Sequence, residues 1–529
     1  MATGIVGEFL DLKSETRAEV LMMQVGDFYE LFADDAELVA DELDLTVSEK
    51  SSGGETFPMA GVPLSEVTPY VRALVERGYT VAVADQAEAG DGHERSITRV
   101  ASPGTLLETT DADARYLAAI VETDDGYGVA FADVTTGRFV VRSAPDRERA
   151  LSDCYRFDPV EILPGPDARD DDDLLAALRT QTDATLTVQE TDAFAPGRAR
   201  HAVREQFGEG TIESVGLDPA TIRAAGAIVS YVETTGTGVL ASMTRIRTGR
   251  ADVSLDATTQ RNLELVETMR GDAEGSLYDT IDGTVTAAGG RLLREWLTNP
   301  IRDPDRLERR HAAVEALSAD ALGREALRET LADAYDLARL ASRTASGSTD
   351  TDGLLRIRDT LALVPEVADA IGSAHRLADS PVATIIEGID HAAATALRAE
   401  LDEALREAPD DEGGVRFRRG YDDDLDAVLD RQSELETWLD DLEGRIKREH
   451  GLRHVTVDRN KTDGYYIQIG KSETDAVPDS FERIKTLKNS ERYTTDRLDE
   501  VERDLLRAEE RRVEIEQRLV AALREAGDR

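Results

Sequence analysis

The chain has 529 residues, 40% of them hydrophobic, with a formal net charge of −45 and a sequence pI of about 4.5. Such a length exceeds what one hydrophobic core supports, so we expect three to five domains. Acidic residues are spread along the whole chain between apolar residues that keep a regular period, which excludes a disordered acidic segment. The charge favours a surface adapted to concentrated salt, as in a halophile's cytoplasm. On charge alone, an ordinary acidic protein that avoids nucleic acid is the alternative.

The cysteine count and the hydropathy of the sequence exclude several further classes of protein. The single cysteine, Cys154, excludes an internal disulfide framework and a cysteine-based metal site. No apolar run approaches the roughly 18 residues of a membrane span. The N-terminus lacks a basic region followed by an apolar one, so no secretory signal is visible. We therefore expect a cytoplasmic protein without a membrane attachment.

The first stretch of interest is Val20–Phe32. It opens as an apolar run of strand length and passes Gly26-Asp27, a turn signal. It then presents Phe28 and Glu30. Local pattern alone favours a core role for Phe28 and a helix start at Glu30.

The following residues continue a mixed α/β pattern. Asp34 or Asp35 is expected to cap a helix. The two prolines around Gly61 predict a rigid turn over 57–63. A helix is expected over 67–75 and a strand over 80–84.

A second α/β unit is predicted over residues 113–235. Residues 117–121 and 128–134 read as paired strands, and a turn leads to a third strand over 138–141. An acidic cluster, 170–173, precedes an apolar helix. Aspartate clusters can hold Mg²⁺, but charge at a helix start on a saline surface is the favoured interpretation.

From about residue 251 the pattern is mostly helical, with one helix expected to begin after Gly289-Gly290. Apolar residues over 425–446 and over 498–519 predict two long helices, each with one apolar seam. Between them, 455–457 and 465–469 read as strands. We expect a small β unit held on two helical arms.

The charge changes sign near that β unit. Five of the seven lysines fall within 447–488, and the window 445–492 holds eleven Lys or Arg against eight Asp or Glu. Phosphate contact requires such a local density of cations. A nucleic-acid surface is therefore predicted there, with a chance or salt-bridged cluster as the alternative.

Four stretches in this order resemble the MutS family of DNA mismatch-recognition proteins. They are Gly26–Phe32, Pro58–Pro63, Leu255–Glu264 and Thr486–Tyr493. Glu30 lies two residues after Phe28, which matches the family's Phe-x-Glu reading motif. Together the stretches are specific, and the resemblance runs from about residue 5 to the end.

The resemblance implies a multidomain fold that combines α/β and all-α parts. The implied parts are a mixed α/β mismatch-recognition domain (1–112), a ribonuclease-H-like α/β connector (113–235), a helical core and lever (236–420), a small β clamp (421–492) and a returning lever helix (493–529).

The resemblance also implies how DNA would be read. Phe28 would enter a mispaired step as a wedge, since such a step stacks poorly and bends cheaply. Glu30 would accept a hydrogen bond from the displaced base. By position, four residues would line the minor groove: Met23, Asp27, Pro58 and Met59. Arg95 and Arg99 would lie near the DNA backbone.

In the clamp, Lys488 and Asn489 match the family motif and would touch phosphates without sequence preference. The charge count adds Lys461, Lys471 and Lys485. The expected partner is double-stranded DNA with mismatches or small loops.

The chain departs from the family at its end. The family carries an ATPase domain with a Gly-rich phosphate loop, but no G-x-x-x-x-G-K-[ST] occurs here. We expect no enzymatic activity, metal or cofactor in this chain. ATP and Mg²⁺, a homodimer and a MutL-type partner are implied for the full-length protein. The chain is then a fragment, a truncated product or half of a split protein.

Two other functions stay open. A structural protein would grip bent or branched DNA through the clamp without reading mismatches. A nuclease would use Asp133 and nearby carboxylates in the connector, but the sequence places only one acid at a strand end there.

Overall fold

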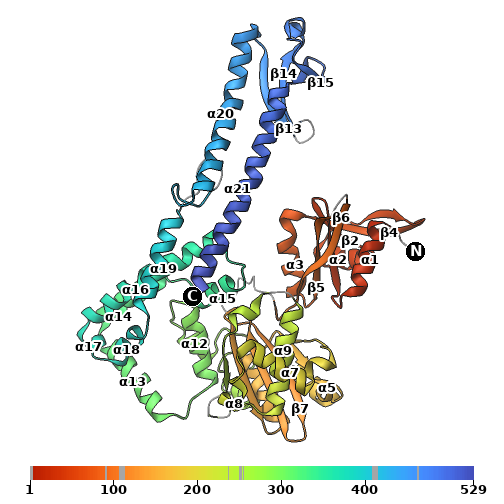
Figure 1. The fold of residues 1–529 in the computed structure, drawn as a ribbon. Helices are drawn as coiled ribbons and strands as arrows, with labels where there is room; N and C mark the ends of the chain where they lie inside the picture. Colours follow the sequence, from red (N-terminus) through yellow and green to blue (C-terminus); the bar gives the residue numbers. More distant parts are fainter. Residues whose placement is uncertain are drawn as a thin grey trace. The chain divides into compact units, whose positions relative to one another are not determined.

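The computed structural model (Figure 1) describes residues 4–89, 92–105, 114–235, 238–248, 253, 255–407, 415–460 and 464–528. It divides into two compact units. The first comprises Met1–Thr349 and Arg356–Thr395, and the second comprises Asp350–Leu355 and Ala396–Gly527. In the described part, no helix is both long and apolar enough to cross a membrane.

The N-terminal domain is built on a six-stranded sheet of order β3-β4-β2-β1-β5-β6. Its strands are β1 (Val20–Val25), β2 (Phe28–Phe32), β3 (Ser48–Ser52), β4 (Glu55–Pro63), β5 (Val81–Ala89) and β6 (Gly92–Ala101). Its helices are α1 (Ile5–Glu15), α2 (Asp34–Leu43) and α3 (Val67–Glu76). Alternate residues of β1 and β2 enter two cores. One face of the sheet packs on α2 and α3, and the other packs on α1.

Two local predictions for this domain are wrong. Ala33, not an aspartate, occupies the N-cap of α2, because the buried Asp35 carboxylate instead accepts bonds from the Leu21 N–H and the Lys13 ammonium, both at 2.7 Å. Residues 57–63 belong to strand β4 rather than a turn. Strand β4 tolerates its prolines for two reasons. Pro58 lies opposite the position one residue beyond the end of β2, and Pro63 is the last residue of β4.

The second domain has a six-stranded sheet of order β11-β10-β7-β8-β9-β12. The strands are β7 (Tyr116–Thr123), β8 (Gly126–Asp133), β9 (Arg138–Ala144), β10 (Glu161–Pro164), β11 (Thr185–Leu186) and β12 (Ile246–Thr248). Helices α7 (Pro196–Phe207) and α9 (Pro219–Thr234) cover one face, and α4 (Arg147–Phe157) and α6 (Asp172–Gln181) cover the other. The three predicted strands are confirmed. Asp171 caps α6 by accepting from the Leu174 N–H, so the acidic cluster marks a helix start as expected.

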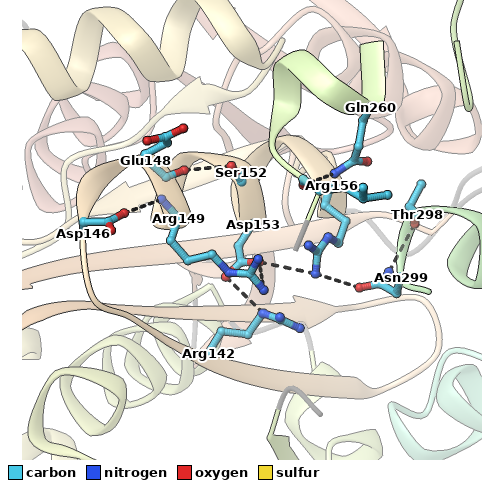
Figure 2. Close-up of polar contacts among 11 residues, drawn as sticks. Arg142, Asp146, Glu148, Arg149, Ser152, Asp153, Arg156, Gln260, Thr298 and Asn299 are labelled. Atoms are coloured by element: carbon cyan, nitrogen blue, oxygen red, sulfur yellow. Dashed lines mark hydrogen bonds and ion pairs between the residues drawn. The ribbon is translucent and has the colours of Figure 1, made fainter. Parts of the chain in front are cut away.

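A buried carboxylate organises the junction between α4 and the helical region that follows (Figure 2). Asp153 has no exposed surface, and guanidinium nitrogens of Arg142, Arg149 and Arg156 lie 3.0, 3.8 and 3.5 Å from it. Burial raises the pKa of Asp153, and the three positive charges oppose that rise. Arg156 also donates to the Asn299 side chain at 2.8 Å, which ties the second domain to the helical region.

The rest of the first unit is helical, as predicted, and includes α10 (Ala257–Asn262), α12 (Ala287–Thr298), α13 (Pro304–Ala319) and α15 (Leu337–Ala345). Smaller helices are α11 (Leu277–Ile281), α14 (Ala321–Ala332), α17 (His375–Ala378) and α18 (Pro381–Glu387). Helices α16 (Thr351–Ser373) and α19 (His391–Ala404) span the division between the units. Helix α12 begins before Gly289-Gly290 rather than after them. The reason is that the Thr286 hydroxyl caps it by accepting from the Gly289 N–H.

The second unit confirms the predicted arms and their β unit. The long helices α20 (Asp423–His450) and α21 (Asp496–Asp528) run side by side, and a four-stranded sheet lies at one end of the pair (Figure 1). The sheet has the order β13-β14-β16-β15. Its strands are β13 (Val455–Asn460), β14 (Gly464–Gly470), β15 (Glu482–Thr486) and β16 (Ser490–Thr494). Its inner face shares one core with α20 and α21. Strands β15 and β16 were not predicted, since β15 is exposed along its whole length and shows no alternation.

The Arg138–Glu295 pair between β9 and α12 gives a testable pH dependence. The two guanidinium–carboxylate contacts measure 2.5 and 2.8 Å. Desolvation raises the pKa of Glu295, but the hydrogen bond and charge of Arg138 outweigh it, so the pKa falls below the ordinary 4.5. The pair therefore stabilises the fold at pH values above 4.5, and this contribution disappears as the pH falls through the lowered pKa of Glu295.

We expect Glu295→Gln to lower the thermal unfolding midpoint at pH 7, and we expect this loss to shrink as the pH is lowered below 4.5. Calorimetric scans across that range measure both. Glu308→Gln, an exposed carboxylate on α13, is the control and should leave the midpoint unchanged. An equal loss for Glu295→Gln at every pH would contradict this account.

Candidate nucleic-acid interface

A two-residue turn joins β1 to β2 and sets the direction of every side chain on β2. Val25 pairs with Phe28, so Gly26 and Asp27 are the two turn residues. Gly26 has φ 61°, as the first position of a type II′ turn requires, and glycine adopts this conformation without strain. This turn fixes the register, with Gln24 opposite Tyr29 and Met23 opposite Glu30.

The alternation of β2 divides its residues between solvent and core. Tyr29 and Leu31 point into the core beneath α2 and α3. Phe28, on the other face, is 49% exposed, which is unusual for a phenylalanine in a sheet. The local prediction that Phe28 is ordinary core is therefore wrong, and Glu30 lies within the strand rather than at a helix start.

Tyr29 anchors the strand from the buried side. Its hydroxyl donates to Asp85 on β5 at 2.5 Å, and the other Asp85 oxygen accepts from Thr98 on β6. Burial raises the pKa of Tyr29, and the hydrogen bond to Asp85 raises it further. The anchor holds β2 in place between the exposed Phe28 and the largely buried Glu30, which flank Tyr29 in sequence.

Glu30 is a carboxylate with an unsatisfied oxygen. Its side chain is 15% exposed, and its Oε2 atom is buried without a hydrogen-bond partner among the described residues. The nearest cation is the Lys50 ammonium on β3, 3.9 Å from Oε2, which is an ion-pair distance but not a hydrogen bond. Sequence reasoning did not identify Lys50, although it is one of only seven lysines.

The remaining predicted groove residues divide into accessible and buried ones. Asp27 is exposed in the turn, and Pro58 and Met59 on β4 are half-buried. Met23 has no exposed surface, because α1 covers it, so the prediction that it lines a groove is corrected.

Arg95 is also corrected, because its side chain is 8% exposed and fully engaged within the protein. It donates to the Gln24 carbonyl, to Glu8 and to Gln86 at 2.6–2.7 Å. This arginine fastens β6 to β1 and α1 instead of facing DNA. Arg99, on β6, is half-buried.

The clamp presents its cations on a hairpin turn. The Leu487 N–H donates to the Ser490 carbonyl at 2.9 Å, so Lys488 and Asn489 are the two central residues of the turn, and both are exposed. The Lys471 N–H donates to the Asn489 carbonyl at 3.1 Å, which brings the exposed Lys471 beside the turn. Lys471 and Lys488 form no ion pair with any residue that the structure describes. Lys461 lies outside the described residues.

The outer face of the clamp sheet continues this surface. Lys485 on β15 is exposed and stands opposite Arg492 on β16. Arg492 lies over the ring of Tyr466, 4.0 Å from its centroid. Sequence reasoning did not single out Arg492, although the positively charged window 445–492 contains it. Tyr466 is buried, so its ring supports the Arg492 guanidinium and is not itself open to a base.

The second domain shows no comparable chemical centre among its described residues. Asp133, the nuclease candidate, accepts from the Thr135 N–H and from the hydroxyls of Thr135 and Thr136 at 2.6–3.0 Å. Its two oxygens therefore stabilise the turn after β8. Across the described part of the chain, no three His, Cys, Asp or Glu side chains are grouped so that they could hold a metal ion.

The sequence of this chain matches known proteins along nearly its whole length. Family models match residues 3–110 (MutS domain I), 115–244 (MutS domain II) and 258–528 (MutS domain III). The DNA mismatch repair protein MutS 1 of Haloarcula marismortui is 58% identical over 97% of this chain. MutS 1 of Halobacterium salinarum is 56% identical over 99%, and MutS of Desulforamulus reducens is 33% identical over 99%.

These relatives are longer than this chain. The match covers 57% of the Haloarcula protein and 61% of each of the other two. Two of the three come from halophiles, which agrees with the acidic composition.

The Tyr29 anchor predicts a stability effect that is separate from any binding. Tyr29→Phe removes a hydrogen bond to a charged group, so we expect a loss of about 1.5–3 kcal/mol in unfolding free energy. Denaturant unfolding at fixed salt measures it. Tyr70→Phe, in the same domain, removes a hydroxyl that makes no hydrogen bond within the described residues and should change little. Equal effects of the two variants would exclude the anchor role.

Proposed function

We propose that this chain, which belongs to the MutS family, binds mismatched DNA and discriminates it from matched duplex through Phe28 and Glu30. The observation that carries the proposal is the position of Phe28, a half-exposed ring next to a turn on an otherwise buried strand. An apolar ring in that position costs free energy in water unless a ligand covers it.

The physical reason for discrimination lies in DNA mechanics. A wedge must unstack a base step, which costs a few kcal/mol in a sound duplex and less where pairing is already defective. The ring of Phe28 then stacks on the displaced base. Glu30 offers the buried Oε2 atom to a donor on that base, and this bond would satisfy an otherwise unpaired oxygen.

The clamp supplies affinity that does not depend on sequence. Lys488 and Asn489 at the turn, with Lys471 beside them and Lys485 on the outer face, fit a phosphate backbone. Arg99 of the N-terminal domain is a further backbone contact in this proposal. Such contacts position the protein but do not read bases.

The salt concentration decides how much of the affinity for DNA comes from Phe28 and how much comes from the clamp cations. At a net charge of −45 the chain repels DNA at low salt, and at molar salt the Debye length shrinks to about 3 Å. The same salt weakens phosphate attraction. Stacking by Phe28 therefore carries a larger share of affinity in the cytoplasm of a halophile, where we place the protein.

The relatives extend beyond the share of their length that this chain matches. We assign ATP hydrolysis, with ATP and Mg²⁺, to the share of the relatives' length that this chain does not match, and no enzymatic activity to the chain itself. A homodimer and a MutL-type repair partner belong to the same proposal for the longer protein.

The clamp also fits the second candidate, a binder of bent or branched DNA that does not discriminate mismatches. Under that function the clamp lysines matter and Phe28 does not. Substitution of Phe28 therefore separates the two candidates, whereas substitution of Lys488 tests the clamp contact that both share.

We expect Phe28→Ala to abolish the preference for mismatched DNA. Stacking of one base on an aromatic ring contributes about 1–3 kcal/mol, so affinity for a mismatched or one-base-looped duplex should fall by about 5- to 150-fold. Affinity for the matched duplex should change less than about twofold. Fluorescence anisotropy in high potassium chloride measures both. Leu10→Ala, an exposed apolar residue on α1, is the control. A Phe28→Ala protein that still discriminates would refute the wedge.

We expect Lys488→Ala to lower the affinity for matched and for mismatched duplexes by the same factor. Losing one phosphate contact should lower the slope of log K against log salt by about 0.9. Lys447→Ala is the matched control, because Glu443 already pairs with Lys447 at 2.5 Å. A salt titration of both variants makes the comparison. A change confined to the mismatched duplex would contradict a backbone role for Lys488.

A further inference from the structure

Lys50 and Glu30 form an ion pair that lacks a hydrogen bond. The ammonium and Oε2 are 3.9 Å apart, so charge attracts them but no hydrogen bond forms. Oε2 is nevertheless buried and has no other partner within the described residues. A buried oxygen without a donor is costly, and such groups occur where function requires them.

The sheet explains why this carboxylate is left open. Strand β4 lies between β2 and β3, and the residue of β4 opposite Glu30 is Gly61. Glycine places no side chain beside the carboxylate. Lys50 comes from the far strand, β3, where its side chain is 41% exposed. Within the described residues this ion pair is the one polar interaction of the Lys50 side chain, so a competing phosphate can draw its ammonium away from Glu30.

We infer that Lys50 is a specificity-determining residue that covers the Glu30 carboxylate and exchanges it for a DNA phosphate when a mispaired base donates to Glu30. The inference rests on the proposed function and adds a residue to its reading site. On a matched duplex no base reaches Glu30, so Lys50 stays with the carboxylate and adds no phosphate contact. On a mismatch the base donor replaces the ammonium, which then neutralises a phosphate.

The exchange links recognition to backbone affinity. A lysine that always contacted phosphate would strengthen matched and mismatched complexes alike. A lysine held by Glu30 strengthens only the complex in which Glu30 has found a base. Electrostatic attraction, which is normally indifferent to sequence, then contributes to discrimination.

Salt dependence measures this exchange directly. For the native chain we expect the slope of log K against log salt to be steeper for the mismatched duplex by about 0.9, the value of one phosphate contact. Lys50→Gln should remove that difference by lowering the mismatched slope alone. Glu30→Gln should also remove it, but by raising the matched slope, because Lys50 is then released on both duplexes.

A double-mutant cycle on the matched duplex tests the pairing. Lys50→Gln should change matched affinity less than about twofold when Glu30 is present and about fivefold or more in the Glu30→Gln background. Glu49→Gln is the matched control. It removes an adjacent exposed carboxylate on β3 whose side chain points to the opposite face. The Glu49→Gln background should therefore not reproduce the coupling.

Equal effects of Lys50→Gln in all backgrounds would overturn the inference and make Lys50 an independent phosphate contact. No effect in any background would overturn it as well. Failure of the proposed function looks different, because the native chain would then bind both duplexes equally. The cycle on matched DNA still reports the pairing in that case.

Discussion

The register of strand β2 is the constraint on which the reading site depends. Because a strand's side chains alternate, the pairing of Val25 with Phe28 decides at once that Tyr29 is buried and Phe28 is not. A slip of one residue would place Tyr29 outside and bury Phe28. The Gly26 turn and the Tyr29–Asp85 hydrogen bond hold the register from two directions. An exposed aromatic ring is thereby held by a rigid sheet rather than a loop, which suits the proposed role of unstacking a base step.

The scarcity of lysine makes the position of each one informative. Lys13 bonds to the buried Asp35 and stabilises the fold. Lys50 faces Glu30. The other five fall in or beside the clamp, where Lys488 occupies a turn and Lys485 stands opposite Arg492. Arginine, by contrast, is used throughout for internal pairs such as those around Asp153. A flexible ammonium suits exchangeable contacts, whereas the planar guanidinium suits fixed ones.

Sequence pattern predicted those parts of the fold whose periodicity is strong. Residues 425–446 and 498–519 keep one apolar face and form α20 and α21, and the apolar strands of the second domain were found for the same reason. Strand β15 is exposed on both faces and carries no such signal. Asp34 or Asp35 was expected to cap a helix, because the sequence does not show that Lys13 and the Leu21 N–H bind the Asp35 carboxylate instead. Family position placed Met23 and Arg95 near DNA, but it does not show that α1 and Glu8 enclose them. The sequence pattern did not indicate Lys50 because its partner, Glu30, lies two strands away in the sheet.

Salt should act differently on the two surfaces. The clamp cations are exposed, so concentrated salt screens their attraction to phosphate and replaces it with counterions. Stacking on Phe28 involves no net charge, and the Glu30 oxygen lies in a buried site that ions reach poorly. Raising the salt concentration therefore reduces binding to any duplex more than it reduces the difference between duplexes. Under the proposed function, weak general affinity for DNA in concentrated salt is then compatible with discrimination between duplexes, because stacking on Phe28 depends least on the forces that salt removes.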